Sequence, residues 1–106
     1  MAGGRRELAW APQARRDLID IWKYFAKAAS PEIADGLLRD FKTAAARLEN
    51  HPHLGRPRDE VANGLRSLLL RSHLIIYRVT ETQVDIARVL HERRDITAAF
   101  AEDRNS

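Results

Sequence analysis

Side chains able to bind phosphate and to transfer protons lie within or directly after three apolar runs between residues 64 and 95. Cleavage of RNA without a metal requires a base for the 2′-hydroxyl, an acid for the 5′-oxygen and cations at the phosphate. The candidates are Arg66 and Arg88 for the phosphate and His91, Tyr77 and Glu92 for the protons. The ordinary pKa of histidine, about 6.5, suits proton transfer near neutral pH. These residue types are compatible with a metal-independent endoribonuclease.

Each candidate also has a structural interpretation. His91 can close a strand and hydrogen-bond a neighbouring backbone group, and Arg66 can pair with Asp95 to fix the edge of a sheet. All Lys and Arg residues after residue 63 are arginines. Arginine suits bidentate binding of phosphate or carboxylate, although a GC-rich coding background would produce the same excess. The residue types alone leave both interpretations open.

The apolar runs predict the sheet that would carry these residues. They are rich in Val, Ile, Leu and Tyr and are separated by short polar breaks, which indicates an antiparallel meander with strands over 65–71, 74–79 and 83–90. In the third run, alternation places Val84 and Ile86 on one face and Ala87 and Val89 on the other. We expect one apolar face and an opposite face that displays guanidinium groups. The arginines within or just beyond the strands are Arg66, Arg71, Arg78, Arg88, Arg93 and Arg94.

The N-terminal half supplies a cover for the apolar face. A short strand is predicted over 5–11 and a helix over 12–28, with Pro12 in the first turn, where its missing N–H costs nothing. Ser30 and Pro31 are a good N-cap and first residue for a second helix over 31–50, which must end before Pro52. The predicted fold class is therefore α+β: a strand, an α-helical hairpin packed on one face of the sheet, and a three-stranded antiparallel meander.

The remaining segments are irregular. Residues 51–63 form the one long connection, a kind of segment that is often functional or bound to a partner. Residues 96–100 are predicted to form a short turn, with Phe100 packed back on the domain, and residues 101–106 a frayed polar tail. Residues 1–4 should be a flexible start. The 106 residues together are expected to form a single domain.

Composition limits the class of protein. Hydrophobic residues make up 44% of the chain, and 18 Lys and Arg against 15 Asp and Glu give a net charge of +3. These values are typical of a folded domain that carries a small positive excess. The chain has no Cys and four His, which excludes disulfides and argues against a structural zinc site; no metal or cofactor is expected. The absence of Cys, of a secretory h-region and of a membrane-length apolar run predicts a cytoplasmic protein.

The order of predicted elements, with particular residues at the junctions, resembles the ParE/RelE superfamily of bacterial toxin–antitoxin pairs over about residues 8–96. Five segments in the same order and spacing make the likeness to ParE closer. They are W-A-P-Q-A-R-R-D-L-I-D-I-W-K-Y, H-P-H-L-G-R-P, G-L-R-S, I-I-Y-R-V and R-V-L-H-E-R-R-D. The resemblance implies a growth-arresting toxin neutralised by a ParD-like antitoxin, whose N-terminal part is a ribbon-helix-helix dimer that binds the operator. The toxin itself would meet operator DNA only through the antitoxin.

The resemblance also implies two alternative targets. ParE-type members are held to poison DNA gyrase, whereas RelE-type members cut mRNA on the ribosome. RelE-type enzymes use a dense set of Lys and Arg and often an aromatic residue or His near the C-terminus, but this chain has only Lys23, Lys27 and Lys42, and no Tyr after Tyr77. We therefore expect a gyrase poison, with the endoribonuclease and an inactive, antitoxin-binding member as alternatives.

Two surfaces are predicted for these partners. Exposed cations near the last strand would contact the target: Arg66, Arg88, His91, Arg93 and Arg94. If the chain is a nuclease, the catalytic residues would be Arg66, Arg88 and His91. A groove beside the first helix could accept an amphipathic antitoxin helix. Its predicted residues are Leu18, Ile19, Trp22, Phe25, Ala26 and Leu38.

Overall fold

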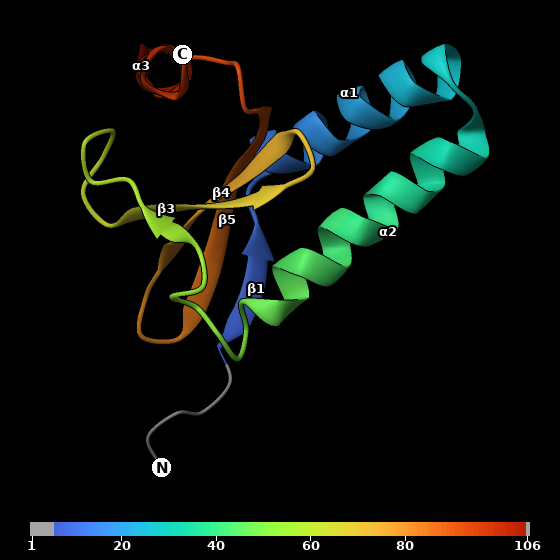
Figure 1. Cartoon of the computed structure of the whole chain (residues 1–106). Coiled ribbons are helices and arrows are strands. Elements are labelled where there is room, and N and C mark those ends of the chain that lie inside the picture. Colours follow the sequence, from blue (N-terminus) through green and yellow to red (C-terminus); the bar gives the residue numbers. More distant parts are fainter. Residues whose placement is uncertain (1–5, 106) are drawn as a thin grey trace.

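The computed structural model describes residues 6–105, so the predicted flexible start at 1–4, the first residue of the predicted strand 5–11 and the last residue of the predicted tail lie outside the described residues. The elements are β1 (Glu7–Trp10), α1 (Pro12–Ala28), α2 (Pro31–Arg47), β2 (Arg56–Pro57), β3 (Leu65–Leu70), β4 (His73–Val79), β5 (Gln83–His91) and α3 (Ile96–Asn105). Figure 1 shows α1 and α2 side by side, with their joined ends projecting away from the sheet.

The sheet has five described strands in the order β1-β5-β4-β3-β2. The strands β3, β4 and β5 form the predicted antiparallel meander, and the two-residue β2 adds to its outer edge. On the other side β1 pairs in parallel with β5, in a register that ends at Trp10 opposite Ile86. The predicted α+β class and order of elements are confirmed, while β2 and the parallel pairing are additions.

The helical hairpin begins and ends where its local chemistry dictates. The Ser30 hydroxyl accepts a hydrogen bond from the Ile33 N–H at 3.1 Å, which satisfies one free donor of the first turn of α2. Ala11 precedes α1 without any side-chain cap, and Pro12 occupies the first turn. The second helix ends at Arg47, three residues earlier than predicted, because Leu48 and Glu49 already hydrogen-bond three residues back.

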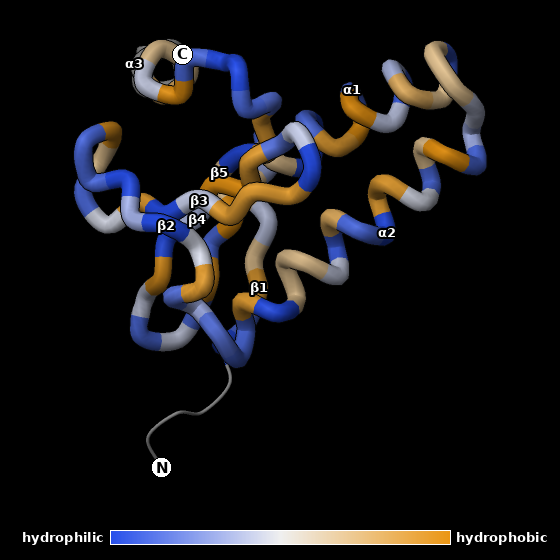
Figure 2. Tube along the Cα trace, in the orientation of Figure 1, coloured by the Kyte–Doolittle hydropathy of each residue, from blue (hydrophilic) through white to orange (hydrophobic). Residues whose placement is uncertain are grey.

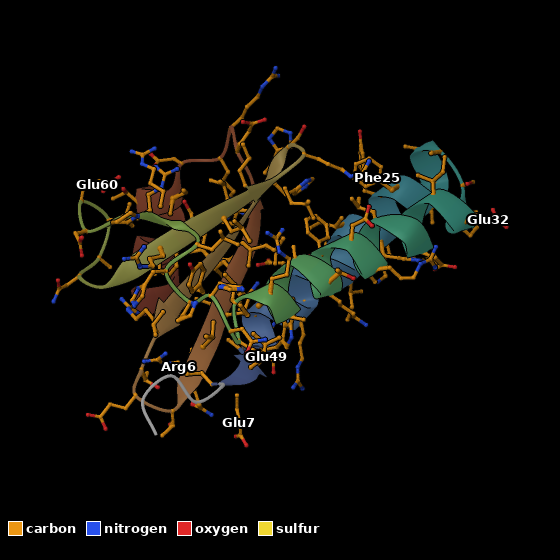
Figure 3. The ribbon with its side chains drawn as sticks, turned by 60° about the horizontal axis from the view of Figure 1, so that its bottom comes forward. Arg6, Glu7, Phe25, Glu32, Glu49 and Glu60 are labelled. Atoms are coloured by element: carbon orange, nitrogen blue, oxygen red, sulfur yellow. The ribbon has the colours of Figure 1, made fainter. Side chains whose placement is uncertain are left out.

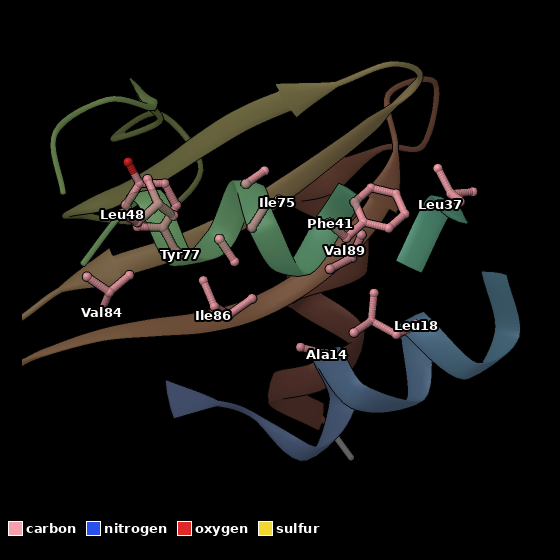
Figure 4. Packing of buried hydrophobic residues seen from close by; sticks show 12 residues of the cluster. Ala14, Leu18, Leu37, Phe41, Leu48, Ile75, Tyr77, Val84, Ile86 and Val89 are labelled. Atoms are coloured by element: carbon pink, nitrogen blue, oxygen red, sulfur yellow. The ribbon is translucent and has the colours of Figure 1, made fainter. Parts of the chain in front are cut away.

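The hairpin packs on one face of the sheet and forms the larger of two hydrophobic clusters (Figure 4). Its buried members come from both helices and from β4 and β5: Ala14, Leu18, Leu37, Phe41, Ala44, Ala45, Leu48, Ile75, Tyr77, Val84, Ile86 and Val89. Val89 was predicted on the opposite face from Val84 and Ile86. The register between β4 and β5 skips Ala87, and this bulge restores Val89 to the helix-covered face.

The opposite face of the sheet is not the predicted display of guanidinium groups. It carries a second buried cluster, in which the strand residues Leu65, Leu74, Ile76 and Leu90 pack with Ala62, Ile96 and Ala99. In Figure 2 apolar segments occupy the centre of the sheet, and hydrophilic residues dominate the connection that precedes β3. The sheet is therefore apolar on both faces and needs a cover on each.

The second cover is α3, where the sequence predicts only a turn and a frayed tail. The Asp95 carboxylate accepts a hydrogen bond from the Ala98 N–H at 3.1 Å and caps the helix. Ile96 and Ala99 are buried, one helical turn apart, and Phe100 packs beside them. The predicted tail at 101–105 is thus helical, because it continues a helix that is capped by Asp95 and buries Ile96 and Ala99 on the second cluster.

Candidate functional site

Arg88 was predicted to face a target, but it is buried against Asp17 of α1. The Arg88 Nε and Nη2 atoms donate to the two Asp17 carboxylate oxygens at 2.8 and 3.1 Å. Both side chains are more than nine-tenths buried, with exposed fractions of 6% and 8%. The same carboxylate accepts the Val89 N–H at 2.9 Å. The prediction of an outward-facing Arg88 is wrong, because its guanidinium joins the last strand to the first helix.

Arg66 and Tyr77 hold the connection between α2 and β3. The Tyr77 hydroxyl donates to the Pro52 carbonyl at 2.7 Å and accepts the Gly55 N–H at 2.8 Å. Arg66 Nη1 donates to the carbonyls of His53 and Gly55 at 3.3 and 2.6 Å. Burial raises the pKa of the Tyr77 hydroxyl, while its bond to Gly55 and the charge of Arg66 act in the opposite direction.

These contacts revise two predictions. The predicted pairing of Arg66 with Asp95 is wrong, since Arg66 binds loop carbonyls and Asp95 caps α3. Tyr77 was a candidate for proton transfer, but its side chain is fully buried and its hydroxyl is engaged on both sides. It therefore orders the connection instead of meeting a substrate.

His91 ends β5 and lies across from His73, the first residue of β4. The two imidazole centroids are 5.2 Å apart, and His73 also contacts the rings of Phe25 and Phe41. His73 is buried, and this burial lowers its pKa; the neighbouring His91 lowers it further, while Glu92 acts in the opposite direction. His91 is exposed, and its Nδ1 accepts the Arg93 N–H at 3.1 Å, as in its structural interpretation.

The three candidate nuclease residues do not converge. Arg66 pairs with Tyr77 and His91 with His73, so they lie against positions four residues apart along β4. At about 3.3 Å per residue this separates them by roughly 13 Å along the strand. Arg88, the third candidate, is buried against Asp17 of α1. Of the predicted target residues, the exposed group near the end of the sheet consists of His91, Arg93 and Arg94.

Two adjoining grooves lie where the helical hairpin leaves the sheet, and Phe25 lies between the hairpin and the end of the sheet in Figure 3. The first, of about 470 Å³, follows α2 and is lined by Phe25, Ile33, Gly36, Leu37, Arg39, Asp40, Arg71, Ser72 and His73. The second, of about 510 Å³, follows α1 and the end of β5; besides Phe25, Ser72 and His73 its lining includes Tyr24, Leu90, His91 and Arg94. Because they share three residues, we treat them as one surface, the hairpin groove.

Most of the residues predicted for the antitoxin surface lie outside the hairpin groove. Among the six predicted residues, Phe25 is the one that lines the hairpin groove. Leu18 is buried in the core. Trp22 is half-buried, and its indole N–H donates to the Asp35 carboxylate at 2.8 Å, which ties α1 to α2. Ile19 is exposed, and Ala26 and Leu38 are half-buried.

Sequence reasoning missed Asp17 and His73. Asp17 lies between Ala14 and Leu18 on the apolar stripe of α1, and a carboxylate on such a stripe signals a buried cationic partner. His73 was read as part of a polar break, whereas it opens β4. Among the described side chains, those of residues 6–100, no three His, Cys, Asp or Glu are grouped as a metal site. No described helix is long and apolar enough to cross a membrane.

Comparison with known proteins places the chain in a family. A family model for the ParE toxin of the type II toxin–antitoxin system parDE matches residues 8–96. Toxin ParE1 of Mycobacterium tuberculosis is 37% identical over 87 residues, covering 81% of this chain and 89% of the relative. Toxin ParE1 of Caulobacter vibrioides is 33% identical over 86 residues, covering 81% and 88%.

The fold agrees with solved structures of toxin–antitoxin systems. A chain of the chromosomal ParDE system from P. aeruginosa superimposes with a TM-score of 0.74 at 23% identity, covering 83% of this chain and 97% of that one. A chain of the RelBE2 complex from Mycobacterium tuberculosis gives a TM-score of 0.59 at 24% identity, covering 82% and 98%. These two similarities show a shared fold, and the family match shows the relationship. The chain belongs to the ParE toxin family of type II toxin–antitoxin systems.

Proposed function

We propose that this toxin poisons DNA gyrase and is neutralised by a ParD-like antitoxin with an N-terminal ribbon-helix-helix dimer. Membership of the ParE family supports the proposal. The observation that carries it is the burial of the Arg88–Asp17 pair together with the fully engaged Tyr77 hydroxyl. The Arg88 guanidinium and the Tyr77 hydroxyl, two of the candidate groups for RNA cleavage, hold the fold, which favours binding over acid–base chemistry.

The proposed target contact is the exposed group at the end of β5, formed by the imidazole of His91 and the guanidinium groups of Arg93 and Arg94. These residues end or directly follow β5, which is paired with β4 up to His91, so their positions are set by the sheet. Arg66 is half-buried and bound to loop carbonyls, and Arg88 is enclosed. Both are therefore dropped from the proposed contact. Arginine side chains in this exposed position suit a macromolecular surface that carries acidic groups.

The antitoxin is proposed to bind the hairpin groove. Phe25, one of the three residues shared by both halves of the groove, is half-buried, and the groove-lining residues Tyr24 and Ile33 are exposed. An amphipathic helix can bury apolar side chains in such a groove, which is a common mode of peptide recognition. The toxin would then reach operator DNA only through the antitoxin.

A pair of assays tests the target. The purified toxin is added to DNA gyrase in supercoiling and DNA-cleavage reactions, and in parallel to purified ribosomes carrying an mRNA. Arrested supercoiling with trapped DNA breaks and intact mRNA is the expected result. Cut mRNA with unaffected gyrase would replace the proposal with a ribosome-dependent endoribonuclease. No effect in either assay, and no growth arrest when the toxin is induced alone, would leave the inactive, antitoxin-binding member.

A further inference from the structure

Gly36 is half-buried on the stripe of α2 that lines the hairpin groove. Ile33, Gly36, Leu37 and Asp40 follow one another at helical spacing, and all line the groove. Glycine in the interior of a helix is less stable than alanine, because it loses more backbone freedom on folding. A glycine at this position therefore calls for a reason.

The chain itself does not supply that reason. A Cβ atom added at Gly36 would meet one side-chain atom, Arg39 Nη2, at 3.6 Å, which is ordinary contact with the end of a flexible side chain. Gly55 differs, since a Cβ there would lie 2.6 Å from the Tyr77 hydroxyl. Gly64 differs as well, because its φ of +80° favours glycine. Nothing among the described neighbours of Gly36 requires the missing side chain.

The surroundings of Gly36 fit a partner of definite chemistry. Ile33, one turn before it, is 57% exposed, so an apolar contact is available beside the glycine. On the rim, Asp40 is paired with Arg71 at 2.6 Å. Arg39 is exposed and has no hydrogen bond or ion pair within the part of the chain that the structure describes. The charged residues that line this half of the groove are therefore two arginines and one carboxylate, which suits a partner with acidic residues.

We infer that Gly36 is the point at which an amphipathic antitoxin helix with acidic flanking residues crosses α2 in close contact. This inference rests on the proposed antitoxin site and assigns one residue to it. The separation of two packed helices is set by the side chains at the crossing, and a glycine there lets the backbones approach. The glycine then lowers the folding stability of the free toxin, and the closer contact that it permits raises the affinity of the complex.

The substitution Gly36→Ala separates these two effects. In the free toxin it should raise Tm by about 4 °C, because alanine is the better helix former and its methyl group meets only the end of the Arg39 side chain at ordinary contact distance. Binding to the proposed ParD-like antitoxin should weaken at least about tenfold, and Gly36→Leu should weaken it further. Ala46→Leu is the matched control, since Ala46 is exposed on α2 and does not line the groove; its Kd should equal that of the wild type.

The outcomes are distinct. If Gly36→Ala and Gly36→Leu bind the antitoxin as tightly as Ala46→Leu does, the crossing point is wrong, whatever the gyrase result. If the wild-type toxin fails to bind that protein at all, the proposed partner is wrong. If the substitutions abolish self-association of the free toxin in sedimentation and leave antitoxin binding intact, the groove belongs to a second copy and the inference is overturned.

Discussion

The Asp17 carboxylate accepts three hydrogen bonds, two from Arg88 and one from the Val89 N–H. The parallel pairing of β1 with β5 ends at Ile86, so the second half of β5 has no strand beside it on that edge. The α1 helix follows β1 directly and brings Asp17 to this edge. A single side chain thus replaces a missing strand contact and neutralises the buried guanidinium.

We predict that Asp17→Ala lowers the free energy of unfolding by about 3–5 kcal/mol, because it leaves the Arg88 charge buried without its carboxylate and the Val89 N–H without an acceptor. The measurement is urea unfolding followed by circular dichroism. Arg71→Ala is the control: its pair with Asp40 is exposed on both sides, and such pairs contribute about 0–1 kcal/mol. Equal losses in the two variants would contradict the role assigned to the buried pair.

The paired strands β4 and β5 carry a pH-sensitive contact between two histidines. His73 and His91 face each other where the two strands meet the hairpin groove, and Glu92 is the neighbouring carboxylate. Burial of His73 lowers its pKa in the folded protein, below the 6.5 of a histidine in the unfolded chain. The folded state therefore binds fewer protons than the unfolded state whenever the pH lies between these two values.

It follows that the contribution of His73 to stability is complete above about pH 6.5 and is lost as the pH falls toward the lower pKa of the folded state. We expect the difference in unfolding free energy between the wild type and His73→Gln to shrink between pH 7.5 and 5.5. His91→Gln is the companion variant, since removing the adjacent imidazole relieves part of the shift. A difference between wild type and His73→Gln that is independent of pH would show that His73 titrates alike in both states.

The elements that sequence could predict are those with a local signal. The Ser30 cap, Pro31 and the apolar stripes of both helices all lie within single segments, as do the three runs of the meander. The bulge at Ala87 could not be predicted, because one extra residue changes the phase of a strand without leaving a mark in composition. The helix after Asp95 has a capping residue, but the sequence predicts a tail there. Its few apolar residues indicate a helix only when it is known that the second face of the sheet is apolar and needs a cover.

At the scale of the molecule, the candidate site was predictable by residue type but not by placement. The described part of the molecule is elongated, 45 by 32 by 21 Å, because the hairpin extends beyond the sheet; Figure 1 shows this projection. Whether an arginine faces inward or outward depends on an acid more than seventy residues away, as Arg88 and Asp17 show. Similarly, the hairpin groove exists only where two helices and a strand turn meet, so no single segment encodes it.

The hairpin groove and the proposed target contact are neighbours. Arg94 lines the groove beside His91, whereas Arg39 lies on the α2 side of the groove and Arg93 is not among the lining residues. An antitoxin segment in the groove would lie against the residues proposed to meet gyrase. An antitoxin bound there would block the target contact sterically. Substitutions at Arg39, on the α2 side of the groove, and at Arg93, outside the groove, should then affect different partners.

Charge reversal at Arg93 and at Arg39 tests whether the target contact and the antitoxin groove are separate. Arg93→Glu should abolish the arrest of gyrase supercoiling while the Kd for the antitoxin changes less than about twofold. Arg39→Glu should weaken antitoxin binding at least about tenfold, by repelling acidic residues, and leave gyrase poisoning intact. Both side chains are exposed, so both variants should unfold within about 0.5 kcal/mol of the wild type. If each substitution impairs both activities to the same extent, one surface serves both partners, and the separation of target contact from antitoxin groove is wrong.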